Sequence, residues 1–234
     1  MFKKLVNPKF NIESDETLLQ KIKFLFKSYL ISFFCTILSV AIITVIDTFI
    51  VKILHQNSLW NEIRNSNSRI KFMFGKYSYL MIAVIIPLIE EIIFRLPLNL
   101  KKSSIAFALS ILYLRFSGNF LTHFLDLTKK EDVFKIIITV IIFFTLFLLL
   151  NQKKLDNLRK NHFRFVFYFI AISFGLIHII NFHNINYFLI LLYPFFVLPQ
   201  FFMGILIGNI RIKYGFIWGW ALHCLINSTS FLLP

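Results

Sequence analysis

The sequence predicts an all-α membrane protein, a transmembrane bundle of about seven helices with a range of six to eight. Three observations lead to this fold class. Of the 234 residues, 58% are hydrophobic and 15% are charged, whereas soluble domains average roughly 45–50% and about 25%. Seven apolar runs approach the roughly 20 residues that a helix needs to cross a bilayer. These runs are continuous rather than alternating, which favours helices over the strands of a membrane barrel.

The apolar runs follow one another along most of the chain. They comprise residues 29–51, 77–98, 104–121, 133–150, 165–180, 187–207 and 214–232. Pro87 lies inside the second run, and Pro194 and Pro199 interrupt the sixth. The third run is short and contains Arg115, so it is the weakest of the seven. Without any internal repeat, the seven runs predict a single transmembrane domain over residues 29–234.

The segments outside these runs are polar and basic. Residues 1–28 are predicted to form a cytoplasmic, partly amphipathic lead-in, and loops are predicted at residues 52–76 and 151–164. The formal net charge is +14, but the Lys and Arg residues lie in short stretches between apolar runs. There they are typical of topology signals and of contacts with anionic lipid headgroups. We therefore expect the lipid bilayer as a partner and no nucleic acid.

The distribution of basic residues also predicts an orientation. More Lys and Arg residues fall on the cytoplasmic side when the N-terminus is placed inside, as the positive-inside rule requires. Heavy use of Ile, Phe, Lys and Asn suits an AT-rich bacterial genome. The predicted location is thus the cell (inner) membrane, spanned several times, with a cytoplasmic N-terminus.

Three ionisable residues occur within about one turn of the second run. Glu90, Glu91 and Arg95 would each cost about 2.5–3.5 kcal/mol at the centre of a bilayer. Glu91 and Arg95 are spaced i,i+4 with the acid first, which favours a helical ion pair. Glu90 is rotated by about 100° from Glu91. The spacing therefore predicts a structural Glu91–Arg95 pair and a Glu90 carboxylate that faces a cavity or a partner.

Two later runs supply groups that could work with Glu90. Phe174 and His178 share one helix face, and His223 and Asn227 share another. A carboxylate with an imidazole can activate water as a general base, and an imidazole with a carboxamide can donate to an oxyanion. Either histidine alone would be more typical of a hydrogen bond between helices. Their joint occurrence with Glu90 favours hydrolysis, while Asp47 in the first run is interpreted as structural.

The three motifs, in this order, are similar to those of the CPBP (Abi) family of intramembrane proteases. This family of CAAX proteases and bacteriocin-processing proteins includes the type II CAAX prenyl endopeptidases. Its E-E-x-x-x-R pattern is met by residues 90–95, its F-x-x-x-H pattern by residues 174–178, and its H-x-x-x-N/D pattern by residues 223–227. Arg211, Gly215 and Trp218 also fit the run that leads into the third motif.

The resemblance implies a peptide hydrolase with its protease-like core in residues 77–232. Glu90 and His178 would activate the attacking water, and His223 and Asn227 would form the oxyanion hole. Glu91, Arg95 and Phe174 would support the site. The substrate would be a membrane-associated peptide or protein, processed as a CAAX-type protein or in bacteriocin maturation or self-immunity.

The need for a metal is left open by the motifs. Zinc could be held by Glu90, His178 and His223, since two histidines and a glutamate form a known ligand set. The H-E-x-x-H pattern is absent, and the same residues explain hydrolysis without metal. A glutamate-type mechanism with no cofactor is therefore favoured.

Three further expectations concern the geometry and the class of function. A cavity between the second, fifth, sixth and seventh runs would admit the substrate. Helix tilt, a kink at Pro87 or shifted span boundaries must bring Glu90 level with His178. The alternatives to a protease are a non-catalytic membrane scaffold or bacteriocin-immunity protein, and a small proton-coupled transporter. A transporter is disfavoured because paired, repeat-related broken helices are not found.

Overall fold

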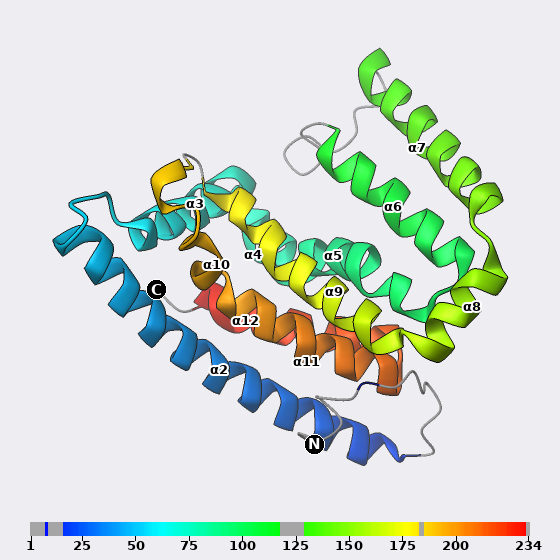
Figure 1. Cartoon of the computed structure of the whole chain (residues 1–234), viewed down its shortest axis with the longest axis horizontal. Helices are drawn as coiled ribbons and strands as arrows, with labels where there is room; N and C mark the ends of the chain where they lie inside the picture. The colour runs from blue at the N-terminus through cyan, green and yellow to red at the C-terminus, as the bar shows by residue number, and fades with distance from the viewer. Residues whose placement is uncertain (1–7, 9–15, 118–128, 183–184, 233–234) are drawn as a thin grey trace.

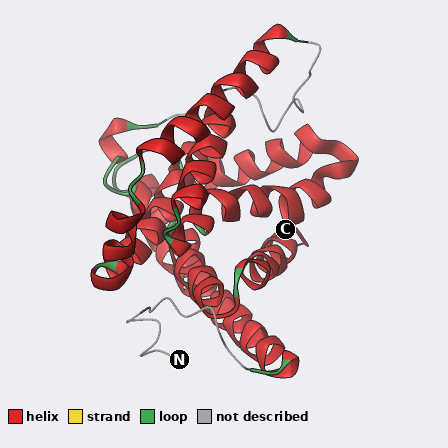
Figure 2. Ribbon diagram, turned by 90° about the vertical axis from the view of Figure 1, so that its right-hand side faces the viewer, coloured by secondary structure: helices red, strands yellow, loops and turns green. Residues whose placement is uncertain are grey.

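The computed structural model describes residue 8 and residues 16–117, 129–182 and 185–232, and in these ranges all regular secondary structure is helical (Figure 2). The longer helices are α2 (Leu18–Lys52), α3 (Leu59–Phe74), α5 (Ile86–Phe94), α6 (Lys102–Phe116), α7 (Lys130–Leu149), α8 (Gln152–Asn161), α9 (Phe163–Ile177), α11 (Leu198–Tyr214) and α12 (Phe216–Leu232). Short turns join them: η1 (Gly75–Tyr77), α4 (Ser78–Leu80), η2 (Met81–Ile85), η3 (Leu96–Asn99), η4 (His178–Asn181), η5 (Tyr187–Leu189) and α10 (Tyr193–Phe196). The all-α prediction is confirmed.

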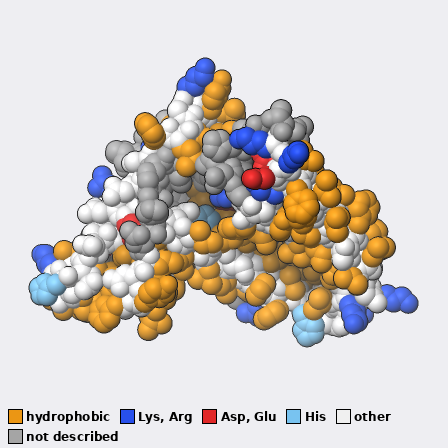
Figure 3. All heavy atoms as spheres, turned by 90° about the horizontal axis from the view of Figure 1, so that it is seen from above, with side chains coloured by type: hydrophobic (Ala, Val, Ile, Leu, Met, Phe, Trp, Pro, Cys, Tyr) orange, Lys and Arg blue, Asp and Glu red, His pale blue; other side chains and the backbone are white. Residues whose placement is uncertain are grey.

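Three helical segments of the described chain are long and apolar enough to cross a membrane. They are Leu18–Lys52, Lys130–Leu149 and Phe163–Asn181, which correspond to the first, fourth and fifth predicted spans. Large hydrophobic side chains are also exposed over much of the surface (Figure 3), as expected of a chain in contact with lipid. The other four predicted spans form shorter or interrupted helices.

The first span begins earlier than the sequence predicted. Thr17 caps α2, since its side chain accepts from the Gln20 backbone N–H while the Gln20 side chain accepts from the Thr17 N–H. This capping box starts the helix at Leu18. Residues 18–28 of the predicted lead-in are therefore helical and continuous with the first predicted span. The rest of the predicted lead-in, residues 1–7 and 9–15, lies outside the described residues.

The two predicted loops are largely helical. Ser58 caps α3 by accepting from the Asn61 N–H at 3.0 Å, and Asn151 caps α8 by accepting from the Lys153 N–H at 2.9 Å. Side-chain caps of this kind satisfy N–H groups that a helix start leaves free. A prediction based on polarity alone overlooks such cap residues and assigns these segments to loops. Asp47 of α2 accepts from Ser58 Oγ at 2.7 Å, which confirms its structural assignment.

The sixth span is broken where its prolines predicted. Pro194 lies in the first turn of α10 and Pro199 in the first turn of α11, positions that proline tolerates because no intrahelical N–H is lost there. In the third predicted span, α6 ends at Phe116, and residues 118–121 lie outside the described residues. That helix is consequently shorter than residues 104–121 implied.

Helix α11 lies at the centre of the bundle. It packs against α2, α9 and α12, while α6 and α7 form a pair at the other side of α5 (Figure 1). A Cβ added at Gly204 of α11 would lie 3.0 Å from the Ala171 carbonyl oxygen and 3.3 Å from the Phe174 ring. The absence of a side chain at Gly204 thus sets how closely α9 approaches α11, and α9 leads into His178.

The second predicted span contains a π-helical turn. This turn, η2, runs from Met81 to Ile85 and is followed directly by α5, with Pro87 in its first turn. Proline has no N–H and its ring crowds the carbonyl four residues earlier. A π turn widens the backbone at such a point, and turns of this kind are frequent at functional sites. The expected irregularity near Pro87 is therefore a widened turn over residues 81–85, about one helical turn before Glu90.

Candidate functional site

The Glu91–Arg95 pair lies in the interior of the bundle. Arg95 Nε is 3.5 Å from Glu91 Oε1, and the two side chains are 1% and 0% exposed. Arg211 of α11 adds a second positive charge that interacts with Glu91. A Cβ at Gly219 would lie 3.4 Å from Glu91 Oε2 and 3.3 Å from Arg211 Cβ, so this glycine leaves room for both. The predicted ion pair between Glu91 and Arg95 is therefore present in the structure.

Glu90 projects away from this pair. Its Oε1 atom lies 3.9 Å from His178 Nε2, and its Oε2 atom lies 3.4 Å from His223 Nε2. The structure thus brings together Glu90 of α5, His178 at the end of α9 and His223 of α12. Glu90 and His178 thus lie close together, although the sequence placed them at different depths along their helices.

The tautomer of His178 follows from its hydrogen bond. Its Nδ1 atom is 2.7 Å from the backbone oxygen of Phe174. A carbonyl oxygen only accepts, so Nδ1 carries the hydrogen. In the neutral ring, Nε2 is then an acceptor that faces Glu90. At 3.9 Å the two groups are too far apart for a direct hydrogen bond but can share a water molecule.

His223 lies between two carboxylates and is 1% exposed. Its Nδ1 atom is 2.9 Å from Glu91 Oε1, so Nδ1 donates to that carboxylate. Its Nε2 atom faces Glu90 Oε2 at 3.4 Å, while Glu90 Oε1 remains directed toward His178.

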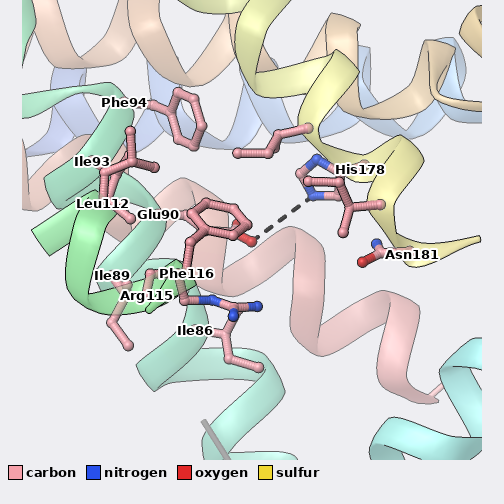
Figure 4. A pocket seen from close by; sticks show the side chains of 12 residues that line it. Ile86, Ile89, Glu90, Ile93, Phe94, Leu112, Arg115, Phe116, His178 and Asn181 are labelled. Atoms are coloured by element: carbon pink, nitrogen blue, oxygen red, sulfur yellow. Dashed lines mark ion pairs between the residues drawn. The ribbon is translucent and has the colours of Figure 1, made fainter. Parts of the chain in front are cut away.

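An open pocket adjoins Glu90. Its polar lining residues are Glu90, Arg115, His178 and Asn181, and the remainder are Ile, Leu and Phe side chains (Figure 4). They come from α5, α6, α9 and η4. The sequence predicted walls from the second, fifth, sixth and seventh spans. In this pocket the helix of the third span takes the place expected for the last two.

Asn227 is hydrogen-bonded to the π-helical turn. Its side-chain Nδ2 donates to the backbone oxygen of Ile82 at 3.1 Å. Two turns earlier on α12, Trp220 Nε1 donates to the oxygen of Val84 at 3.2 Å. Two side chains of α12 thus satisfy carbonyls of η2. Asn227 retains a second amide hydrogen, and no hydrogen bond joins its side chain to Glu90 in the described structure.

The Phe174 ring contacts a buried arginine and both histidines of the site. The Arg95 guanidinium lies 3.7 Å from the centre of its ring, within the range of a cation–π interaction. The same ring meets His178 edge-on with centroids 4.9 Å apart, and His223 with centroids 5.8 Å apart. Phe174 is 0% exposed. Its predicted supporting position is consistent with these contacts.

The donor set does not form a metal cage. Among the described residues, no group of three or more His, Cys, Asp or Glu side chains has the geometry to hold a metal ion. Glu90 lies between the two imidazoles at hydrogen-bonding or water-bridging distances. No chemical step is therefore derived through zinc.

Sequence reasoning missed three contributors to this site. Arg115 was noted only as a reason to doubt the third span, although a cation within an apolar run is itself a functional signal. Asn181 follows the F-x-x-x-H motif by three residues and lay beyond the predicted span. The hydrogen bond from Trp220 to η2 has no sequence signal, because it depends on the widened turn.

Comparison of the chain with protein-family models, with curated proteins and with solved structures found no match. The family resemblance therefore depends on the three sequence motifs alone.

Proposed function

We propose that this protein is an intramembrane endopeptidase of the CPBP type, which hydrolyses a peptide bond of a membrane-associated peptide or protein. One arrangement supports this function: a Glu90 carboxylate with separate roles for its two oxygens, at the wall of an open pocket. The bundle would cross the cell membrane about seven times with the N-terminus in the cytoplasm. Residues 77–232 would form its catalytic core.

The water-activating step uses Glu90 and His178. A water molecule between them donates one hydrogen to Glu90 Oε1 and the other to the unprotonated Nε2 of His178. Its oxygen attacks the peptide carbonyl carbon while Glu90 takes the proton, as a general base does. Glu90 then returns the proton to the amine that leaves. The hydrogen bond of His178 with Phe174 fixes the imidazole in the tautomer that this step needs.

The oxyanion that forms would be stabilised by His223 and Asn227. Glu91 accepts from Nδ1 of His223 and so orients the ring. When Nε2 also carries a hydrogen, it is a donor at the site of reaction, and such preorganised donors contribute strongly to catalysis. The second amide hydrogen of Asn227 would supply the other donor.

Cleavage by purified protein tests this function. Wild-type protein, Glu90→Gln and Glu131→Gln are incubated in detergent with a mixture of apolar peptides, and new termini are identified by mass spectrometry. Glu131 is exposed on α7 and serves as the matched control. We expect cleavage by the wild type and by Glu131→Gln, and at least about 100-fold less by Glu90→Gln. Thermal melting checks that both variants are folded.

Two results would contradict the proposed function. One is a Glu90→Gln variant that keeps more than about a tenth of the wild-type rate, because loss of a general base typically costs about 10²–10⁴-fold. The other is a folded wild-type protein that cleaves none of the peptides in the mixture.

A further inference from the structure

The pocket beside Glu90 has a second polar side. Arg115 lies in the last turn of α6, and its side chain lines the pocket (Figure 4). Glu90 of α5 and His178 of η4 line the same pocket. The pocket therefore offers a cation within reach of the groups that would activate water.

No ion pair or hydrogen bond joins Arg115 to another side chain within the described part of the chain. The guanidinium carbon of Arg115 lies 5.6 Å from the ring centre of its neighbour Phe116. Its charge interacts with Glu90 at longer range. However, both Glu90 oxygens already face imidazoles. The guanidinium of Arg115 thus keeps its donors available to a molecule in the pocket.

The local charge balance favours an anion at this position. Arg95, Arg115 and Arg211 carry three positive charges, and Glu90 and Glu91 carry two negative charges. With both histidines neutral, one positive charge is left without a counterpart. Uncompensated charge is costly in a site surrounded by apolar side chains. A bound anion would remove this cost.

From these contacts and charges we infer that Arg115 is a specificity-determining residue that binds a carboxylate of the substrate, an inference that rests on the proposed function. The planar guanidinium matches a carboxylate through two parallel hydrogen bonds. In a peptide, this group is either the C-terminal carboxylate or an Asp or Glu side chain. Asn181, also at the pocket, can donate an amide hydrogen to the same group. The substrate would thus be held with its carboxylate near Arg115 and its scissile bond near Glu90.

Equilibrium binding of three peptide mixtures tests this inference. All are fluorescently labelled tetrapeptides built from Ala, Val, Leu, Ile and Phe. The first mixture has a free C-terminal carboxylate, and the second has a C-terminal carboxamide. The third has a C-terminal carboxamide and one interior residue replaced by Glu. Binding is measured on the full-length Glu90→Gln protein, so that bound peptide is not consumed, in a detergent without charged groups. The first and third mixtures distinguish the two sources of the carboxylate.

We expect at least one carboxylate-bearing mixture to bind about 10- to 100-fold more tightly than the carboxamide mixture, as for loss of a charged hydrogen bond. Adding Arg115→Gln should abolish this preference, and Arg115→Lys should retain part of it. Arg164→Gln, which removes an exposed arginine from α9, should leave it unchanged. Size-exclusion chromatography and thermal melting confirm that each variant is folded.

Equal affinity for the three mixtures, absence of binding by all three, or a preference that survives Arg115→Gln would overturn the inference. Its failure is distinguishable from failure of the proposed function. Hydrolysis by the wild-type protein without a carboxylate preference removes only the role of Arg115. A carboxylate preference without hydrolysis removes the protease and leaves an anion-binding pocket.

Discussion

The Nδ1 atom of His223 lies 2.9 Å from Oε1 of Glu91, and both side chains are almost fully buried. The same carboxylate oxygen is 3.5 Å from Arg95 Nε. Glu91 therefore balances a buried arginine of its own helix and orients an imidazole of α12. The two adjacent glutamates therefore differ in their surroundings. Glu91 contacts buried groups of two helices, and Glu90 keeps one oxygen directed toward the pocket.

Arg95→Ala should lower the yield of folded protein, because it leaves Glu91 buried without its i,i+4 partner. Breaking a buried ion pair by removing one member typically costs about 3–5 kcal/mol. The double substitution Glu91→Gln with Arg95→Gln should recover part of this loss, since the amide oxygen can still accept from His223. Fluorescence-detected size-exclusion chromatography and thermal melting measure both effects. Normal folding of Arg95→Ala with reduced turnover would assign the pair to function instead.

Phe174→Leu should lower the melting temperature and slow turnover. It removes the ring that lies against the Arg95 guanidinium, and cation–π contacts are worth about 0.5–2 kcal/mol. It also removes the surface against which the His178 imidazole packs. Phe169→Leu is the matched control, because Phe169 is exposed on the same helix. Equal melting temperatures for the two variants would show that the Phe174 ring contributes no special stabilisation.

Comparison of Trp220→Phe with Asn227→Ala should separate support of the π turn from catalysis. Each substitution removes one hydrogen bond to an η2 carbonyl, which typically contributes about 0.5–1.5 kcal/mol of stability. Only Asn227→Ala also removes an oxyanion donor, so its turnover should fall by about 10²–10³-fold while Trp220→Phe remains near wild type. Melting curves and rates are measured on the same samples. Comparable losses of activity would attribute the role of Asn227 to the turn alone.

The parts of this molecule that followed from sequence are those set by local spacing. The i,i+4 rule placed Glu91 against Arg95 and turned Glu90 away from it. Proline chemistry located the breaks at Pro194 and Pro199. Apolar composition identified α2, α7 and the α9–η4 segment as long enough to span a membrane. Each of these features depends on residues within one continuous stretch of the chain.

Features that depend on packing between distant segments could not be predicted. The position of Arg115 beside Glu90 depends on how α6 packs against α5. The contact between His223 and Glu91 joins residues on α12 and α5. Sequence motifs indicated that these histidines and glutamates belong together but not which nitrogen faces which oxygen. The helical caps at Ser58 and Asn151 were local signals that polarity obscured.

Removal of metal provides the remaining prediction. The glutamate-type mechanism assigns general-base and hydrogen-bonding roles to the groups that a zinc site would use as ligands. His223 donates to Glu91 through Nδ1, and His178 donates to a backbone oxygen through Nδ1, so only their Nε2 atoms remain for any other partner. Histidines at zinc sites also use the second nitrogen to bond an acceptor, so these hydrogen bonds alone do not separate the two mechanisms.

We expect exhaustive chelation to change the rate little, and His223→Ala and Asn227→Ala each to keep measurable activity, since loss of one oxyanion donor costs about 10²–10³-fold. A zinc mechanism predicts otherwise: His223→Ala would lose the ion together with all activity, and Asn227→Ala would matter less because a carboxamide is a poor zinc ligand. Elemental analysis of the wild type and of His223→Ala is therefore performed beside turnover with and without chelator. Stoichiometric zinc in the wild type, with activity lost on chelation and restored by zinc, would replace the glutamate-type mechanism with a metal-dependent one.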